Sequence, residues 1–308
     1  MSPSQKAADH SQRLARARLS LDGLSVGDAF GERFFGPPGE AIRRIVAREV
    51  PMAPWRWTDD TAMALSIVDV LAEHGRVDQD ALSDTFTARY RAEPWRGYGG
   101  GARRLLQRVD AGAHWSVVAP SLFEGNGSYG NGAAMRVAPI GAYFADDQER
   151  AAAEASLSAV VTHSHPEAKA GAVAVAVATA LAWQHRGAPL DQLREAVFEG
   201  TLQICPPSKT REGIEEARQL SSEVAAHEVA GKLGSGDDVS SQDTVPFCLW
   251  AAMRHPSSFE DAMWATVSGL GDRDTTCAIV GGVVALSATD GVPATWLEAR
   301  EALSAPPR

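Results

Sequence analysis

The feature that most constrains the fold is a series of Ala, Leu and Val runs at helical spacing, separated by Gly, Pro and Asp clusters. The longest apolar run, 170–183, is too short to cross roughly 30 Å of hydrocarbon and predicts a buried helix. The sequence therefore predicts an all-α protein. We expect helices over 12–30, 61–73, 79–92, 102–111, 132–144, 148–162, 167–186, 190–202, 209–227, 244–253, 258–269, 276–288 and 294–303.

Length and charge narrow the class of protein. The 308 residues, 44% of them hydrophobic, can bury a core, and we expect one domain over 1–308 with a flexible tail over 1–11. The 29 Lys and Arg against 39 Asp and Glu give a net charge of −10, which opposes binding to nucleic acid and anionic lipid. Scattered cysteines and the absence of an apolar leader predict a cytoplasmic protein with reduced thiols.

The first polar cluster stands directly before an apolar helical run. Thr58, Asp59, Asp60 and Thr61 crowd one predicted helix start. One such residue suffices to cap a helix, because a single side-chain oxygen accepts from the free N–H groups of the first turn. The surplus of carboxylates makes a ligand site the alternative to a simple cap.

A second cluster of the same kind precedes the apolar run near the end of the chain. Asp272 and Asp274 are spaced by two, and Thr275 adds a hydroxyl oxygen. A ligand set of oxygens alone suits Mg²⁺, Mn²⁺ or Ca²⁺ and argues against zinc. The residues alone leave open whether the two clusters meet around metal ions or cap two independent helices.

Four further segments have two interpretations each. The loop 125–132 is rich in glycine and precedes a predicted helix, which is typical of a phosphate-binding loop or of an ordinary turn. His163 and His165 beside a helix start are weak evidence for a ligand or base. The turn 98–101 either lines a pocket or opens a helix, and the polar stretch 231–243 is either a binding loop or a surface connection.

Four stretches together resemble the ADP-ribosylglycohydrolase family. They are GLSVGDAFGE (23–32), WTDDTAMAL (57–65), GSYGNGAAMR (127–136) and GLGDRDTTCAIVGGVVA (269–285). They run from near the start to near the end, so the resemblance covers nearly the whole chain. It implies a compact orthogonal helical bundle with a dinuclear metal cleft, which cleaves the bond between the distal ribose of ADP-ribose and an acceptor.

The resemblance also implies a site. Two Mg²⁺ or Mn²⁺ ions are expected on Thr58, Asp59, Asp60, Asp272, Asp274 and Thr275. Asp59 or Asp60 is the expected base, and a metal-polarised water the nucleophile. Contacts to ADP-ribose are expected from Gly99, Phe123, Gly127, Ser128, Tyr129, Gly130, Asn131 and His163.

One position departs from the family pattern. Many relatives carry a glutamate, serving as acid, base or lid residue, at the spacing that falls here on Phe35. Glu32 is the nearest substitute and the expected acid, and 31–40 is the expected movable lid. We expect Asp28 to support the site without binding the metal.

Two rival functions remain at this stage. One is a non-catalytic, crystallin-like ADP-ribose binder, which complete ligand residues disfavour. The other is a dinuclear phosphohydrolase, which the lack of metal-binding histidines disfavours. The expected partners are ADP-ribose and an ADP-ribosylated substrate. We expect no binding to a membrane, and binding to nucleic acid only where it is a modified acceptor. We expect the protein to be a monomer.

Overall fold

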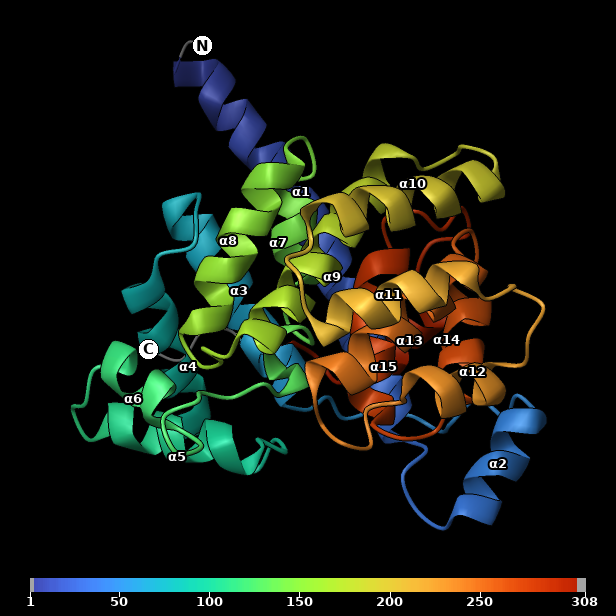
Figure 1. Cartoon of the computed structure of the whole chain (residues 1–308), viewed down its shortest axis with the longest axis horizontal. Coiled ribbons are helices and arrows are strands. Elements are labelled where there is room, and N and C mark those ends of the chain that lie inside the picture. Colours follow the sequence, from blue (N-terminus) through green and yellow to red (C-terminus); the bar gives the residue numbers. More distant parts are fainter. Residues whose placement is uncertain (1–2, 304–308) are drawn as a thin grey trace.

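The computed structural model describes residues 3–303, which form helices and no β-strand (Figure 1). The all-α prediction is therefore confirmed. The helices are α1 (Pro3–Glu32), α2 (Pro38–Val46), α3 (Asp59–His74), α4 (Gln79–Ala92), α5 (Gly100–Asp110), α6 (Trp115–Ser121), the 3₁₀ turn η1 (Asn131–Ala133), α7 (Ala138–Tyr143), α8 (Gln148–Val160), α9 (Pro166–Gln184), α10 (Leu190–Ile204), α11 (Lys209–Gln219), α12 (Ala226–Leu233), α13 (Ser241–Arg254), α14 (Phe259–Val267), α15 (Arg273–Val284) and α16 (Ala294–Ala299).

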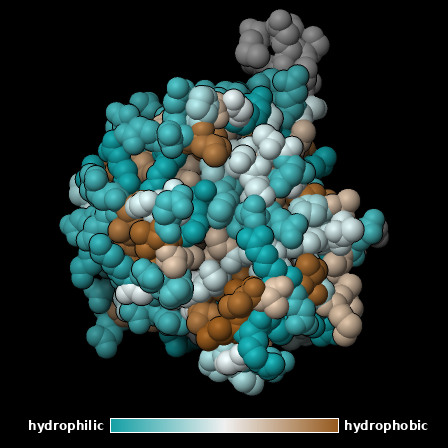
Figure 2. Space-filling view, turned by 90° about the vertical axis from the view of Figure 1, so that its right-hand side faces the viewer, coloured by the Kyte–Doolittle hydropathy of each residue, from teal (hydrophilic) through white to brown (hydrophobic). Residues whose placement is uncertain are grey.

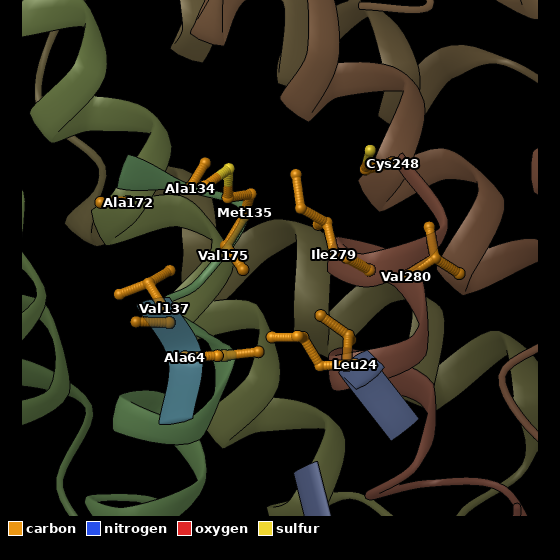
Figure 3. Close-up of a cluster of buried hydrophobic side chains, with 14 of the residues drawn as sticks. Leu24, Ala64, Ala134, Met135, Val137, Ala172, Val175, Cys248, Ile279 and Val280 are labelled. Atoms are coloured by element: carbon orange, nitrogen blue, oxygen red, sulfur yellow. The ribbon is translucent and has the colours of Figure 1, made fainter. Parts of the chain in front are cut away.

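The hydrophobic core joins helices from both ends of the chain. Helix α9, the predicted buried helix, packs against α7, α8, α10 and α13 and is buried along almost its whole length. Figure 3 shows Leu24 of α1, Ala64 of α3, Val175 of α9 and Ile279 of α15 gathered in one cluster. Burial of these side chains holds the first and last thirds of the chain together.

Helices α1 and α15 approach so closely that only glycine fits between them. A Cβ atom on Gly23, Gly27 or Gly31 of α1 would overlap the carbonyl oxygens of Gly281, Cys277 and Arg273 respectively. This crossing is the most extensive helix contact among the described residues. It brings the end of α1 beside the start of α15.

Several predicted helices need correction. The predicted helix 132–144 is instead η1 followed by the short α7, with Pro139 in the first turn of α7. The predicted helix 209–227 is broken into α11 and α12, because the Ser221 hydroxyl accepts from the Glu223 N–H in a turn that competes with the helix. Helices α2 and α6 were not predicted; both are short, and α6 contains Pro120.

Boundaries also differ near the predicted loops and tail. Helix α1 begins at Pro3, whereas the sequence predicts a tail up to residue 11. The predicted connection 231–243 is shortened to 234–240, since α12 ends at Leu233 and α13 begins at Ser241. Helix α15 begins three residues earlier than predicted, which places Asp274 in its first turn.

Helix α2 lies at the edge of the molecule (Figure 1). The face turned toward the viewer in Figure 2 is mostly hydrophilic, with separate hydrophobic patches. Ile42 and Val46 of α2 are among the exposed apolar side chains. Within residues 3–303 every helix is too short or too polar to cross a membrane.

Candidate functional site

Three helices each bring one aspartate to a common point, two of them buried and the third, Asp274, half-buried. Asp28 lies on α1, Asp60 on α3 and Asp274 on α15, and one carboxylate oxygen from each lies within 4.8 Å of the other two. The glycine crossing of α1 and α15 accounts for the first and third of these positions. The two acidic clusters of the sequence therefore meet in space, as the resemblance implies.

Asp28 connects α1 to the start of α3. Its two oxygens accept from the backbone N–H of Thr58 (2.9 and 3.1 Å), and one of them also accepts from the N–H of Thr61 (3.1 Å). Thr58 is the N-cap residue of α3. Its hydroxyl accepts from the Asp60 N–H and donates to Asp60 Oδ2 (3.0 Å). Asp28 and Thr58 thus satisfy free N–H groups at the start of α3, so the side chains of Asp59 and Asp60 are not needed as caps.

At the start of α15 the N-cap position does not serve as a cap. The side chain of Asp272 makes no capping hydrogen bond; its Oδ2 accepts from Asn131 Nδ2 (2.8 Å). This bond ties the glycine-rich loop to the acidic cluster. Asp274 follows in the first turn of α15.

Burial and mutual repulsion disfavour the charged forms of these aspartates. Burial raises the pKa of Asp28 to about 6, and burial together with the charge of Asp28 raises the pKa of Asp59 to about 7. The pKa values of Asp60 and Asp274 are raised well above the ordinary value, by burial and by the neighbouring carboxylates. A bound cation would reverse these shifts.

The donor set fits a hard divalent cation. Asp60 Oδ1 and Asp274 Oδ1 are buried, and neither has a hydrogen-bond partner among the described residues. Buried carboxylate oxygens without partners are costly, and coordination to a cation would satisfy them. Three clustered carboxylates without His or Cys are ligands of the Mg²⁺, Mn²⁺ or Ca²⁺ type.

A cavity of about 600 Å³ opens beside this cluster. Most predicted site residues line it, namely Asp59, Asp60, Gly99, Phe123, Ser128, Tyr129, Gly130, Asn131, His163, Asp272, Asp274 and Thr275. Gly127 does not: it has a φ of +72° and packs against Ser164, so it shapes the loop from behind. Thr58 and Glu32 face a neighbouring cavity instead.

The glycine-rich loop is held in place by the connection before α13. The N–H of Asn131 donates to the Val239 carbonyl (3.2 Å), and the N–H of Ser241 donates to the Tyr129 carbonyl (3.1 Å). Gly130 and Ser240 form an isolated antiparallel bridge. Part of the stretch 231–243 therefore lies at the cavity, where Asp238 and Val239 contribute to the lining.

His163 presents one ring nitrogen to the cavity. Arg136 Nη2 donates to Thr162 Oγ1 (2.8 Å), which lies 2.7 Å from His163 Nδ1. We infer that the threonine hydroxyl donates to Nδ1, since its oxygen already accepts from Arg136 and it makes no other hydrogen bond among the described residues. Burial lowers the pKa of His163 to about 3, so the ring is neutral and carries its proton on Nε2, beside Gly130 and Gly132.

Two aromatic rings stand at the rim of the cavity. Phe123 and Tyr129 are 45% and 47% exposed, with ring centroids 6.5 Å apart and a tilt of 35°. The guanidinium of Arg104 lies over the Phe123 ring at 5.6 Å and also lines the cavity. The exposed parts of both rings can contact a planar ligand at the rim.

Sequence reasoning missed some of these residues. The sequence predicts that Asp28 supports the site without binding the metal, whereas the structure places it in the aspartate cluster. An acidic residue inside an otherwise apolar helical run is the feature that could have indicated this position. Arg104, Met63 and Met135 line the cavity without any pattern that would have indicated it. Phe35, at the family's glutamate position, is 47% exposed under the Arg273 guanidinium and lines neither cavity.

Known proteins resemble this chain in sequence and in fold. A sequence model of the ADP-ribosylglycohydrolase family matches residues 9–305. The chain is 29% identical to ADP-ribosylhydrolase ARH3 of Homo sapiens, with 94% of this chain and 90% of that protein covered. It is 30% identical to the Bos taurus ARH3, with 96% and 91% covered.

Two more distant similarities concern a bacterial relative and a solved structure. The ADP-ribosylarginine hydrolase Tri1 of Pseudomonas putida is 27% identical, with 93% of this chain and 74% of that protein covered. A solved ADP-ribosylglycohydrolase-related protein complex shares the fold, with a TM-score of 0.65 over 94% of each chain at 24% identity. With a family match over nearly its whole length and the same helical fold, the chain belongs to the ADP-ribosylglycohydrolase family.

Proposed function

We propose that this protein is a divalent-metal-dependent hydrolase that cleaves the glycosidic bond between the distal ribose of ADP-ribose and an acceptor, and so reverses mono-ADP-ribosylation. The observation that carries the proposal is the buried aspartate cluster, with two unpartnered carboxylate oxygens, at one end of a cavity that could hold a nucleotide. The names of the relatives, which are ADP-ribosylhydrolases, support it.

The acidic clusters would hold two Mg²⁺ or Mn²⁺ ions. The proposed ligands are Thr58, Asp59, Asp60, Asp272, Asp274 and Thr275, with Asp28 completing the carboxylate cluster. Bound divalent ions supply an activated water near neutral pH and orient sugar hydroxyls. Asp59 lines the cavity beside Asp60 and Asp274, where its carboxylate would accept the proton that an attacking water loses.

The rest of the cavity suits the ADP part of the ligand. Phe123 and Tyr129 stand close to the ~7 Å separation that a base between two rings needs at normal contact distance. Backbone N–H groups around Ser128 and Gly130 would hold the diphosphate in an otherwise acidic protein, since neutral donors attract anions locally. The Nε2 proton of His163 faces the same loop.

Glu32 is the proposed acid where an acceptor needs a proton to leave. Burial and the charge of Asp28 raise its pKa, which favours the protonated form. Glu32 lies in the neighbouring cavity, with Thr58 and Asp274 on the same wall. It can therefore reach the leaving group only from the side away from the glycine-rich loop.

The test is release of ADP-ribose from peptides modified on arginine or serine and from an ADP-ribosylated nucleotide, with Mg²⁺, with Mn²⁺ and with EDTA. We expect metal-dependent release that Asp274→Ala abolishes and Asp191→Ala leaves unchanged, because Asp191 also occupies a first helical turn but is exposed and lines neither cavity. ADP-ribose binding without release from any substrate would favour the binder. Phosphate or AMP release would favour the phosphohydrolase.

A further inference from the structure

A second cavity of about 450 Å³ adjoins the aspartate cluster on the side away from the glycine-rich loop. It shares Asp274 and Gly97 with the first cavity, and Thr58 forms part of its wall. The turn that carries Gly97 is joined to the start of α3, since the N–H of Asp59 donates to the Arg96 carbonyl (2.7 Å). A group attached to a sugar at the aspartates would extend into this second cavity.

Two of the three glutamates in this cavity are already paired with one arginine. Arg96 Nη1 donates to Glu301 Oε2 (2.7 Å) and Arg96 Nη2 to Glu93 Oε1 (2.8 Å). The same guanidinium lies over the Trp57 indole, 3.4 Å from its centroid. The cavity wall thus already binds one guanidinium between carboxylates and an aromatic face.

The remaining glutamate and a second indole have no such partner. The side chain of Glu32 makes no hydrogen bond or ion pair with another of the described residues, and Trp95 is 72% exposed. Three glutamates line the cavity against two arginines, Arg56 and Arg96, and Arg56 is exposed. The balance of charge therefore favours a cation.

We propose that the second cavity is the acceptor subsite and that it takes a guanidinium, which makes an arginine side chain the acceptor. This inference rests on the proposed function. A guanidinium is planar and always charged, so it can stack on Trp95 while Glu32 accepts its N–H groups. A serine acceptor presents neither charge nor a flat face, so it would leave Trp95 without a stacking partner and Glu32 without a cation to bind.

The reaction with this acceptor needs no separate proton donor. Water adds its oxygen to the anomeric carbon, and the bond from that carbon to the guanidino nitrogen breaks with its electrons going to nitrogen. The proton lost by the water passes through Asp59 to that nitrogen, so the products are ADP-ribose and a guanidinium. Glu32 then acts as a carboxylate that binds the acceptor.

The test compares peptides that differ only in ADP-ribosyl-arginine or ADP-ribosyl-serine. Unaltered protein should cleave the arginine peptide with the higher kcat/KM. Trp95→Ala should lower that kcat/KM about tenfold, chiefly through KM, while Trp95→Phe keeps most of it. Affinity for free ADP-ribose, measured by calorimetry, should stay the same, because ADP-ribose has no acceptor.

Glu32→Gln should weaken arginine-peptide cleavage similarly, whereas Glu149→Gln is the matched control, since Glu149 is exposed in the first turn of α8 and lines neither cavity. As an independent measurement, agmatine should inhibit cleavage by the unaltered protein and do so about tenfold less well in Trp95→Ala.

Three results would overturn the inference while leaving hydrolysis intact: preference for the serine peptide, equal loss on both peptides in Trp95→Ala, or no loss on either. If the unaltered protein cleaves neither peptide but releases ADP-ribose from an ADP-ribosylated nucleotide, only the inference is overturned. If it cleaves none of the three substrates with either metal, the proposed function itself fails, and the acceptor subsite falls with it.

Discussion

At the residue scale, hydrogen bonds made outside the cavity determine which ring nitrogen of His163 carries the proton. Arg136 is fully buried, with its guanidinium over the Phe86 ring, and its donation to Thr162 leaves the threonine hydroxyl free to donate to His163. His163 is thereby kept as a donor toward the loop. Arg136 and Thr162 are positioning residues for this reason.

Thr162→Val should weaken ADP-ribose binding about fivefold to tenfold, because the isosteric valine removes the proton that holds the His163 tautomer. It should also cost about 1–3 kcal/mol of stability, since Arg136 loses a buried acceptor. Calorimetry measures the affinity, and nitrogen NMR of the imidazole reports the tautomer.

The matched control is Thr179→Val, because Thr179 is a buried threonine of α9 whose hydroxyl donates only to the Val175 carbonyl. An unchanged Nε2–H tautomer in Thr162→Val would contradict the assignment.

At the element scale, the site depends on how closely two helices cross. Gly27 precedes Asp28 on α1 and faces the Cys277 carbonyl of α15, so any side chain there separates the helices. Asp274 sits three residues before Cys277, at the end of α15 that meets α1. Spacing between the aspartates is therefore set by backbone contact between two elements.

Gly27→Ala should destabilise the protein by about 1–3 kcal/mol or more, because the added methyl overlaps rigid backbone. Metal affinity should fall as well, since the aspartates move apart. Urea unfolding and metal titration by calorimetry measure the two effects. Gly39→Ala on α2, where a Cβ meets nothing within 4 Å, should not lower stability; equal losses in both variants would contradict the crossing argument.

On the scale of the whole molecule, the acidic cluster opposes folding when no cation is bound. Carboxyl groups with raised pKa values bind more protons in the folded than in the unfolded chain, so they make stability fall as pH rises above the ordinary aspartate range. His163 and His255, with lowered pKa values, act in the opposite direction below about pH 6.5.

A comparison with Asp60→Asn separates these contributions, since both proteins have the same histidines. In EDTA, the free energy of unfolding of the unaltered protein should fall relative to that of Asp60→Asn as the pH rises from about 5 to about 8. Urea unfolding at several pH values in this range measures the difference. Parallel pH profiles would contradict the role of Asp60. At pH 8, Mn²⁺ or Mg²⁺ at about 100 times its dissociation constant should stabilise the unaltered protein by about 2.7 kcal/mol and the variant by much less.

Short-range patterns explain what could be predicted for the fold and the site. Helical spacing and helix starts located α4 and α9 almost to the residue, and the polar surplus before α3 and α15 located the acidic clusters. Competition between local turns and helices is what the pattern missed at η1 and between α11 and α12. Both depend on hydrogen bonds that periodicity does not describe.

The sequence by itself determined the helices, their capping residues and the family motifs, because these depend on residues a few positions apart. Only the tertiary structure decided that Asp28 joins Asp60 and Asp274, that Glu32 and Thr58 face a second cavity, and that Phe35 faces neither. The physical reason is the contact between α1 and α15, which joins opposite ends of the chain through bare backbone.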